Sequence, residues 1–273
     1  MKKCVSLLLA FLLIAALPVC ALAENRLEKI LAAGKLTVAT SPDFAPAEFI
    51  DPTKTGQESI VGEEMLLAYY IAEQLGVELV IEAMDFSAVQ GAVSQAKIDL
   101  GISGFSPTPE RAESMELSDP YEFEVAENEQ GLLVRTEDSA LYASLEDFAG
   151  KKVAAQNGSL QQNLVNSQLP DSKIELITNL NDAVMMLITG KVDAVGISGA
   201  NGKTFCNNYP DIMMCDFYYD YESLGQVAGM KKGEVELCAK INEIIKKAAD
   251  AGLFPKWYED AQDLANEIGW QND

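Results

Sequence analysis

The chain has 273 residues, of which 48% are hydrophobic and 10 are prolines, a composition typical of a globular protein large enough for two domains. Its 42 acidic residues outnumber its 20 basic residues, and the formal net charge of −22 excludes nucleic acid as a partner. The chain has no histidine and no C-x-x-C pair, so we predict no metal site, no cofactor and no nucleophile activated by histidine.

The first 23 residues have the layout of a secretory signal peptide. Two lysines precede an apolar run from Val5 to Ala16, and Ala21-Leu22-Ala23 forms an A-x-A cleavage site before Glu24. The apolar run is too short to span a bilayer. We therefore expect an extracytoplasmic protein, in the periplasm or at the cell exterior, that begins at Glu24 after cleavage.

Cys20 offers an alternative interpretation, in which the cysteine carries a lipid and tethers the protein to a membrane. Val19 is bulkier than the small residue that such sites place before the cysteine. The folded pattern also begins by about Arg26, which leaves almost no spacer. We favour the cleaved form without lipid.

The cysteines after the signal are odd in number, so at least one of them is unpaired: Cys206, Cys215 and Cys238. A disulfide between Cys206 and Cys215 is one alternative in an exported protein, and two buried free thiols are the other. Both remain open from the residues alone.

The first half of the chain alternates strand and helix patterns, which predicts a mostly parallel sheet covered by helices. Hydrophobic periodicity and turn residues indicate, in chain order, a strand at Leu36–Thr40, a helix at Glu63–Leu75, a strand at Val77–Ile81, a helix capped by Ser87 that runs through Ala96, and a strand at Ile98–Ile102.

A second unit repeats this order. Its elements are a strand at Lys152–Ala155, a helix at Leu160–Leu169, a strand at Ile174–Ile177, a helix at Asn181–Thr189 and a strand at Val192–Ile197. A local echo supports a repeat, because SQAKIDLGISG ends at Gly104 and ITGKVDAVGISG ends at Gly199. We therefore expect two lobes that offer strand carboxyl ends to a shared cleft.

The chain is expected to cross twice between the lobes and so to form a hinge. Gln130–Arg135 would carry it into the second lobe, and Ser223–Met230 would return it, with the C-terminal helices Glu236–Ala251 and Lys256–Ile268 packing on the first lobe. The predicted division is residues 24–131 plus 223–273 for the first lobe and 132–222 for the second.

One arginine follows the strand at Ile98–Ile102. The turn residues Ser103-Gly104 and SPTP end that strand, and Arg111 comes just after them. Ligands collect at the carboxyl edge of open α/β sheets, so this arginine is a candidate ligand contact.

Several motifs together resemble one protein family. The first lobe has DFAPAEF (43–49), MDFSAV (84–89), SGFSPTPER (103–111) and LSDPY (117–121), and the second has LEDFAGKKVAAQNGSLQ (145–161) and ITGKVDAV (188–195), with GLFPKWYE (252–259) near the end. This series resembles the extracytoplasmic solute-binding proteins of family 3, the polar amino-acid receptors of ABC importers. The first helix departs from the family pattern at Glu63 and Leu66.

The resemblance implies an α/β, two-lobed type II periplasmic-binding fold, in which each lobe is a mostly parallel sheet flanked by helices and two crossings form the hinge. It also implies that Arg111 binds the ligand α-carboxylate through its planar guanidinium. The other implied ligand-binding residues are Gly104 and Ser106 in the same loop, Phe44 and Phe86 around the ligand side chain, and Gln156, Ser159 and Leu160 in the second lobe. Neither Phe44 nor Phe86 occupies a position natural for the core.

Ser198 departs from the family where members that bind ordinary amino acids commonly have an aspartate for the ligand ammonium. A serine hydroxyl accepts a hydrogen bond but supplies no charge. Either another acid, such as Asp43 or Glu48, replaces it, or the ligand lacks a standard amine.

The expected function is a monomeric binding protein that closes on an amino acid or similar small carboxylate and presents it to the membrane permease of an ABC importer. One alternative is a dehydratase-like enzyme on the same fold, for which Asp43 or Glu48 would be the proton donor. Another is a ligand-sensing module that works without a transporter.

Overall fold

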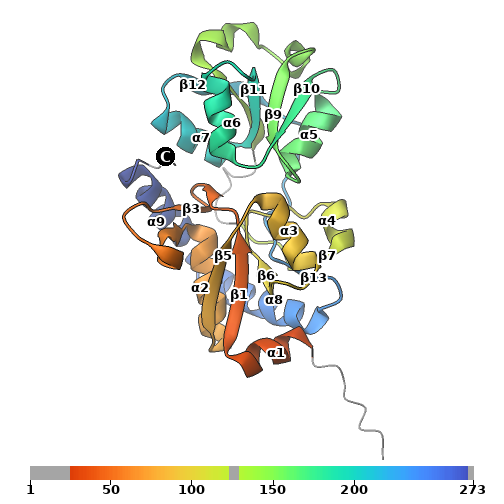
Figure 1. Cartoon of the computed structure of the whole chain (residues 1–273), viewed down its shortest axis with the longest axis vertical. Coiled ribbons are helices and arrows are strands. Elements are labelled where there is room, and N and C mark those ends of the chain that lie inside the picture. The colour runs from red at the N-terminus through yellow and green to blue at the C-terminus, as the bar shows by residue number, and fades with distance from the viewer. Residues whose placement is uncertain (1–24, 123–128, 270–273) are drawn as a thin grey trace, which may run out of the picture.

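Two five-stranded sheets, each flanked by helices, make up the computed structural model, which describes residues 25–122 and 129–269 (Figure 1). The predicted signal peptide lies outside these residues. Over the described ranges, no helix combines the length and the apolar character needed to cross a membrane.

The first sheet contains, in spatial order, β5 (Glu78–Ala83), β1 (Lys35–Thr40), β6 (Leu100–Gly101), β13 (Gly229–Lys231) and β7 (Met115–Leu117). The helices around it are α1 (Arg26–Ala33), α2 (Glu63–Leu75), α3 (Phe86–Ser94), α4 (Pro109–Ser114), α8 (Val235–Asp250) and α9 (Leu253–Glu267). Strand β1 pairs in parallel with β5 and β6, whereas β13 runs antiparallel to β6 and β7.

The second sheet contains, in spatial order, β10 (Lys173–Ile177), β9 (Lys152–Gln156), β11 (Ala194–Ser198), β8 (Gln130–Arg135) and β12 (Ile212–Tyr218). Around it lie α5 (Leu160–Gln168), α6 (Leu180–Ile188), α7 (Gly199–Asn208) and the 3₁₀ turns η3 (Thr136–Leu141) and η4 (Leu145–Phe148). Strands β10, β9 and β11 are parallel, and β8 runs antiparallel to β11 and β12.

Each sheet therefore has one antiparallel strand, and in each case it is the first strand after the chain has left the other sheet. Strand β8 follows the passage out of the first sheet, and β13 follows the return. The two passages are hydrogen-bonded to each other, because Tyr121 and Gln226 exchange amide-to-carbonyl bonds of 2.9 and 2.8 Å. The predicted type II two-lobed fold is confirmed, whereas the exact lobe limits stay a prediction.

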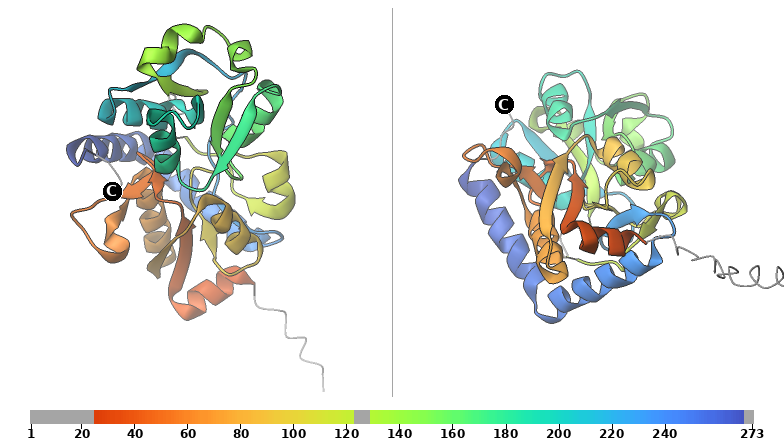
Figure 2. Two further views of the ribbon diagram at one scale, coloured as in Figure 1. Left: turned by 45° about the horizontal axis from the view of Figure 1, so that its top comes forward. Right: turned by 60° about the horizontal axis from the view of Figure 1, so that its bottom comes forward.

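The apolar core explains the predicted elements, because the helix and strand periodicities each bury one face. One cluster joins α2, α8 and the strands of the first sheet, with Leu67, Ile71 and Ile244 fully buried. Figure 2 shows α8 and α9 meeting at a corner along the outer side of the first lobe. The C-terminal end of α9 was expected to pack on the first lobe alone, but it also contacts the second lobe, since Ala265 packs in a cluster with Phe205 and Ile212.

Two local predictions are wrong. Ser87 does not cap a helix, because α3 already begins at Phe86 and Asp85 occupies the N-cap position. The last helix begins at Leu253 rather than Lys256, directly after Gly252, which has a φ of 65°. Pro255 is accommodated there, because amides in the first turn of a helix have no intrahelical acceptor.

A small sheet beside the cleft holds the segment that follows β1. It consists of β2 (Asp43–Phe44), β3 (Glu48–Ile50) and β4 (Ile60–Val61), with η1 (Gly56–Ser59) before β4. Gly62 then starts α2 at a φ of 127°, and a Cβ atom there would lie 2.1 Å from the Ala47 carbonyl oxygen. Only glycine permits this approach, which places the amides of Glu63 and Glu64 on the carbonyls of Pro46 and Ala47.

The three described cysteines are free thiols. Cys215 lies in the cluster on one face of the second sheet, together with Leu132 and Val134 of β8. Cys206 packs with Leu133 and Phe205 in the cluster on the opposite face. Because the sheet separates the two side chains, the structure excludes the Cys206–Cys215 disulfide.

Thiol titration of the exported protein in denaturant should therefore detect Cys206, Cys215 and Cys238 as free thiols. In the native protein Cys215 should react slowly, because burial raises the pKa of its thiol to about 12. An intact mass lower by two hydrogen atoms, restored by a reductant and abolished in Cys206→Ser, would contradict this arrangement.

Candidate functional site

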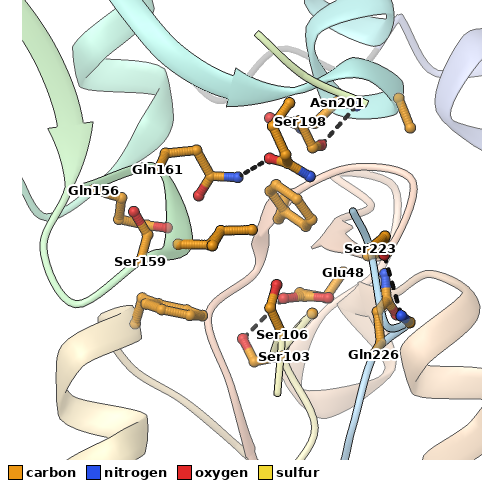
Figure 3. A pocket seen from close by; sticks show the side chains of 18 of the residues that line it. Glu48, Ser103, Ser106, Gln156, Ser159, Gln161, Ser198, Asn201, Ser223 and Gln226 are labelled. Carbon is orange, nitrogen blue, oxygen red and sulfur yellow. Dashed lines mark hydrogen bonds between the residues drawn. The ribbon is translucent and has the colours of Figure 1, made fainter. Parts of the chain in front are cut away.

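A pocket lies between the two sheets, at the carboxyl ends of strands β1, β6, β9 and β11. Its walls enclose about 800 Å³ of space, part of which is open to solvent. All nine residues proposed from the sequence line it: Phe44, Phe86, Gly104, Ser106, Arg111, Gln156, Ser159, Leu160 and Ser198. Figure 3 shows Ser103, Ser106 and Glu48 on one side of this pocket and Ser198 and Asn201 on the opposite side.

Arg111 contributes a buried guanidinium to the pocket wall. Thr108 caps α4 by accepting a hydrogen bond from the Arg111 amide at 3.2 Å, which orients the side chain. One terminal nitrogen donates to the Ser106 carbonyl oxygen, and the other donates across the cleft to the Gly158 carbonyl oxygen at 3.1 Å. The residue is only 5% exposed, and its Nε has no hydrogen-bond partner among the described residues.

Arg111 forms no salt bridge with a carboxylate in the part of the chain that the structure describes, whereas Arg26 pairs with Asp99 and Arg135 pairs with Asp138. Its guanidinium instead lies 4.8 Å from the centre of the Phe105 ring and 5.7 Å from that of Phe86. Burial lowers the pKa of Arg111 to about 10, so the group stays charged at neutral pH. A buried cation without a counter-ion favours an anionic ligand.

The loop before α4 is held by contacts that the sequence did not indicate. Gly104 has a φ of 57° and donates its amide to the buried Glu64 carboxylate at 3.2 Å. The Ser106 side chain shares a hydrogen bond with Tyr221, which lies on the return passage between the lobes. These contacts fix the loop, and they engage the Gly104 amide within the protein, although the family resemblance implies a ligand contact for Gly104.

The two phenylalanines differ in burial. Phe44 is half-buried on the pocket wall, and its ring packs against Gly104. Phe86 is 8% exposed and packs edge to face on Phe105 with ring centres 5.4 Å apart. The expectation that Phe86 lies outside the core is therefore wrong, because starting α3 at Phe86 turns the ring into the cluster of Val89, Val93 and Phe105.

The amino end of α5 points to the pocket from the second lobe. The Ser159 hydroxyl caps the helix by accepting from the Gln162 amide at 3.1 Å. The amides of Gly158 and Ser159 are used within the turn, where they donate to the Gln162 side chain and to the Gln156 carbonyl. The positive end of the helix and the first-turn amides of Leu160 and Gln161 remain for an anion.

Gln156 and Asp43 contact each other across the cleft. The Gln156 side-chain amide donates to the Asp43 carboxylate at 2.9 Å and to the Thr178 carbonyl at 3.2 Å. The same Asp43 oxygen accepts from the Leu180 amide at 2.8 Å. Burial raises the pKa of Asp43 to about 6, against the opposing effect of these hydrogen bonds. Both polar groups are thus engaged between the lobes.

Ser198 is the amino-terminal cap of α7, and its hydroxyl accepts from the Asn201 amide at 3.4 Å. The Asn201 side chain also lines the pocket, and its Oδ1 has no hydrogen-bond partner among the described residues. Sequence reasoning missed Asn201, although its position three residues after a predicted strand-end serine was a usable signal. It also missed Gln130 and Gln161, which meet through a 2.6 Å hydrogen bond.

Carboxylates outnumber cations in the pocket lining. Asp43, Glu48 and Glu122 belong to it, against the single positive charge of Arg111. Glu48 is 1% exposed and accepts from the Ser103 hydroxyl at 2.8 Å, as Figure 3 shows. The lining can therefore attract both an anionic group, at Arg111, and a cationic group.

Comparisons with known proteins agree with this geometry. Residues 36–260 match the model of the bacterial extracellular solute-binding proteins, family 3. The chain is 30% identical to the arginine-binding extracellular protein ArtP of Bacillus subtilis (strain 168) over 267 residues, which cover 94% of this chain and 98% of ArtP.

Two solved structures extend the likeness. An amino acid ABC transporter substrate-binding protein, AbpA from Streptococcus pneumoniae Canada MDR_19A bound to L-arginine, is 36% identical with a TM-score of 0.80, over 87% of this chain and 98% of AbpA. The ancestral amino acid-binding protein AncCDT-1, a precursor of cyclohexadienyl dehydratase, is 26% identical with a TM-score of 0.76, over 86% and 98% of the two chains. The chain thus belongs to the bacterial extracellular solute-binding proteins of family 3.

Proposed function

We propose that this protein binds an L-amino acid with a cationic side chain, with arginine as the first candidate, and presents it to the permease of an ABC importer. The observation that carries the proposal is the buried Arg111 guanidinium, which lies in the interlobe pocket without a carboxylate partner among the described residues. The relatives ArtP, named an arginine-binding protein, and AbpA, whose structure has L-arginine bound, support this choice of ligand.

The pocket suggests which end of the ligand goes where. Arg111 and the amino end of α5 would bind the α-carboxylate from the two lobes, because both present positive charge or free amides. Phe44 and Phe86 would flank the aliphatic part of the side chain. The Ser198 hydroxyl and the Asn201 Oδ1 atom would accept from the α-ammonium, and Glu48 would supply the negative charge that a guanidinium requires.

Binding would stabilise the closed arrangement of the lobes. The ligand carboxylate touches residues of both lobes in this proposal, so its contacts exist fully only when the lobes are together. The passages through Tyr121 and Gln226 supply the hinge, since they form the hydrogen-bonded pair of segments between the sheets. We propose that the protein works as a monomer.

A catalytic role is not part of the proposal. Asp43 and Glu48 are the acids that a dehydratase mechanism would use, and each already accepts hydrogen bonds within the protein. The relation to AncCDT-1, itself named an amino acid-binding protein, supports binding rather than turnover. The purified protein can be incubated with a cyclic carboxylate while absorbance is recorded. Conversion of this substrate would contradict the proposed absence of a catalytic role.

One prediction concerns export. If residues 1–23 are removed, the intact mass of the secreted protein should correspond to a chain that begins at Glu24 and carries no lipid. A mutant with Ala23 replaced by a bulky residue should accumulate uncleaved and serves as the control. A lipid found on an amino-terminal Cys20 would contradict the assignment.

Another prediction concerns Arg111. Removing one partner of a buried charge pair costs about 2–5 kcal/mol, so Arg111→Ala should weaken arginine binding at least about 30-fold in calorimetric titration. Arg111→Lys should retain part of the affinity, since it keeps the charge and loses the bidentate geometry. Lys246→Ala, which removes an exposed charge on α8, is the matched control. Equal affinity of Arg111→Ala and wild type would reject the carboxylate role.

A further prediction tests the charge of Glu48. Citrulline has nearly the shape of arginine but a neutral end, so the wild type should prefer arginine, and Glu48→Gln should lower that preference by about 10-fold to 100-fold. Glu236→Gln, on the exposed side of α8, should leave it unchanged. A preference unaffected by Glu48→Gln would assign the cationic end to another part of the pocket.

A further inference from the structure

The segment Asp43–Phe49 of the first lobe is inserted into the second lobe. Ala45 and Phe49, both fully buried, belong to the same apolar cluster as Leu180 of α6 and Phe205 of α7. The segment therefore contacts the amino-terminal regions of two second-lobe helices, and it does so beside the ligand pocket.

Polar contacts accompany this insertion, and each one pairs a first-lobe acceptor with a second-lobe donor. The Asp43 Oδ2 atom accepts from the Leu180 amide at 2.8 Å and from Gln156 Nε2 at 2.9 Å. The Ala45 carbonyl accepts from Asn201 Nδ2, in the first turn of α7, at 2.9 Å. The other Asp43 oxygen accepts from the Ser41 hydroxyl at 2.9 Å, which holds the carboxylate within its own lobe.

The hydrogen bond from the Leu180 amide to Asp43 lies at the amino end of α6. Leu180 is the first residue of α6, so its amide has no acceptor within the helix. The helix's own cap, Asn179, accepts from the Asn181 amide instead. Asp43 therefore completes the capping of α6 from the other lobe, through a carboxyl oxygen that can accept this hydrogen bond whether or not the group is protonated.

We propose that Asp43 is a positioning residue for closure: its carboxylate joins the lobes by capping α6 and binding Gln156, and thereby sets the ligand affinity. This inference rests on the proposed closure around an amino acid. It concerns the contact between the lobes and not the groups that hold the ligand. When the lobes separate, water replaces both second-lobe donors, so the contact stabilises only the closed form.

The contact should also depend on pH. Burial in the closed form raises the pKa of Asp43 to about 6, whereas a carboxyl facing water has a pKa near 3.8. Closing therefore takes up a proton between these values, so closure and affinity are greater at pH 5 and decline as the pH rises through about 6. These two pKa values correspond to about a tenfold change in affinity between pH 5 and pH 7.5.

Other ionisable groups lie on the elements around Asp43. They are Glu48 on β3, Glu63 and Glu64 at the start of α2, and the exposed Asp182 in the first turn of α6. The pKa of Asp43 responds to burial and to the neutral donors Leu180, Ser41 and Gln156. A variant that cannot ionise at position 43 separates its contribution from that of these acids.

The experiment compares the wild type with Asp43→Ala and Asp43→Asn, using the mature chain and arginine as the ligand. Asp43→Ala should weaken binding about 10-fold to 30-fold at pH 5, and small-angle X-ray scattering of the ligand-bound protein should show a larger open fraction at subsaturating ligand. Asp43→Asn keeps the shape and one acceptor, so it should fold normally and lose the tenfold pH dependence. Asp182→Asn removes a carboxylate at the same end of α6 within the second lobe. It should change neither the affinity for arginine nor its pH dependence.

Scattering of the ligand-free protein between pH 5 and 7.5 separates this inference from the proposed function. A shift towards the compact form at pH 5 in the wild type, absent in Asp43→Asn, supports the closure role even if arginine proves not to be the ligand. Wild-type affinity and pH dependence retained in Asp43→Asn and Asp43→Ala would overturn it. Failure of the wild type to bind any amino acid would instead contradict the proposed function.

Discussion

The buried guanidinium of Arg111 is the group on which the arrangement of the cleft depends. Removing a charge from water costs several kcal/mol unless hydrogen bonds and a counter-ion compensate for it. Here the compensation comes from the Ser106 carbonyl in the same loop, the Gly158 carbonyl of the other lobe and two aromatic rings. Among the described residues, no carboxylate forms a salt bridge with the guanidinium, unlike those of Arg26 and Arg135. In the proposed function, the carboxylate of an amino acid supplies that salt bridge between the lobes.

The contact between the lobes differs in kind from the core of each lobe. Within the lobes, clusters of leucine, isoleucine, valine and phenylalanine exclude water permanently. Across the cleft the contacts are mostly hydrogen bonds of Asp43, Ala45 and Gly158, together with the short insertion of Ala45 and Phe49. Hydrogen bonds that water can replace make an interface that opens and closes at small net cost. This balance suits the ligand-stabilised closure that we propose.

The topology places the contact between the lobes at the strand ends. In each sheet the one antiparallel strand is the first strand after the chain arrives from the other lobe. The two passages between the lobes pair at Tyr121 and Gln226. The echo of ISG in the two halves puts Ser103 and Ser198 at corresponding strand ends, facing the pocket from opposite lobes. Ser103 donates to Glu48, whereas Ser198 caps α7, so equivalent serines have acquired different partners.

Local pattern was sufficient for most of the elements, and the family resemblance supplied nine residues of the pocket, although not Gln130, Gln161 or Asn201. Helix α2 matches its predicted limits, because apolar periodicity and Gly76 define both its face and its end. The nine proposed residues all line one pocket, since residues that follow parallel strands gather at a single sheet edge. The sequence also sufficed to identify the family, through a series of motifs spread over both lobes.

Only the tertiary structure decided what those side chains contact. Asp43 contacts Gln156 of the opposite lobe, and Ala45 contacts Asn201. In each pair the two residues are more than a hundred positions apart in the sequence. The separation of Cys206 from Cys215 depends on which face of the second sheet each one occupies. The burial of Phe86 depends on where α3 begins and on the ring of Phe105. Such contacts are set by how distant elements pack, and strand and helix periodicity carries no information about distant partners.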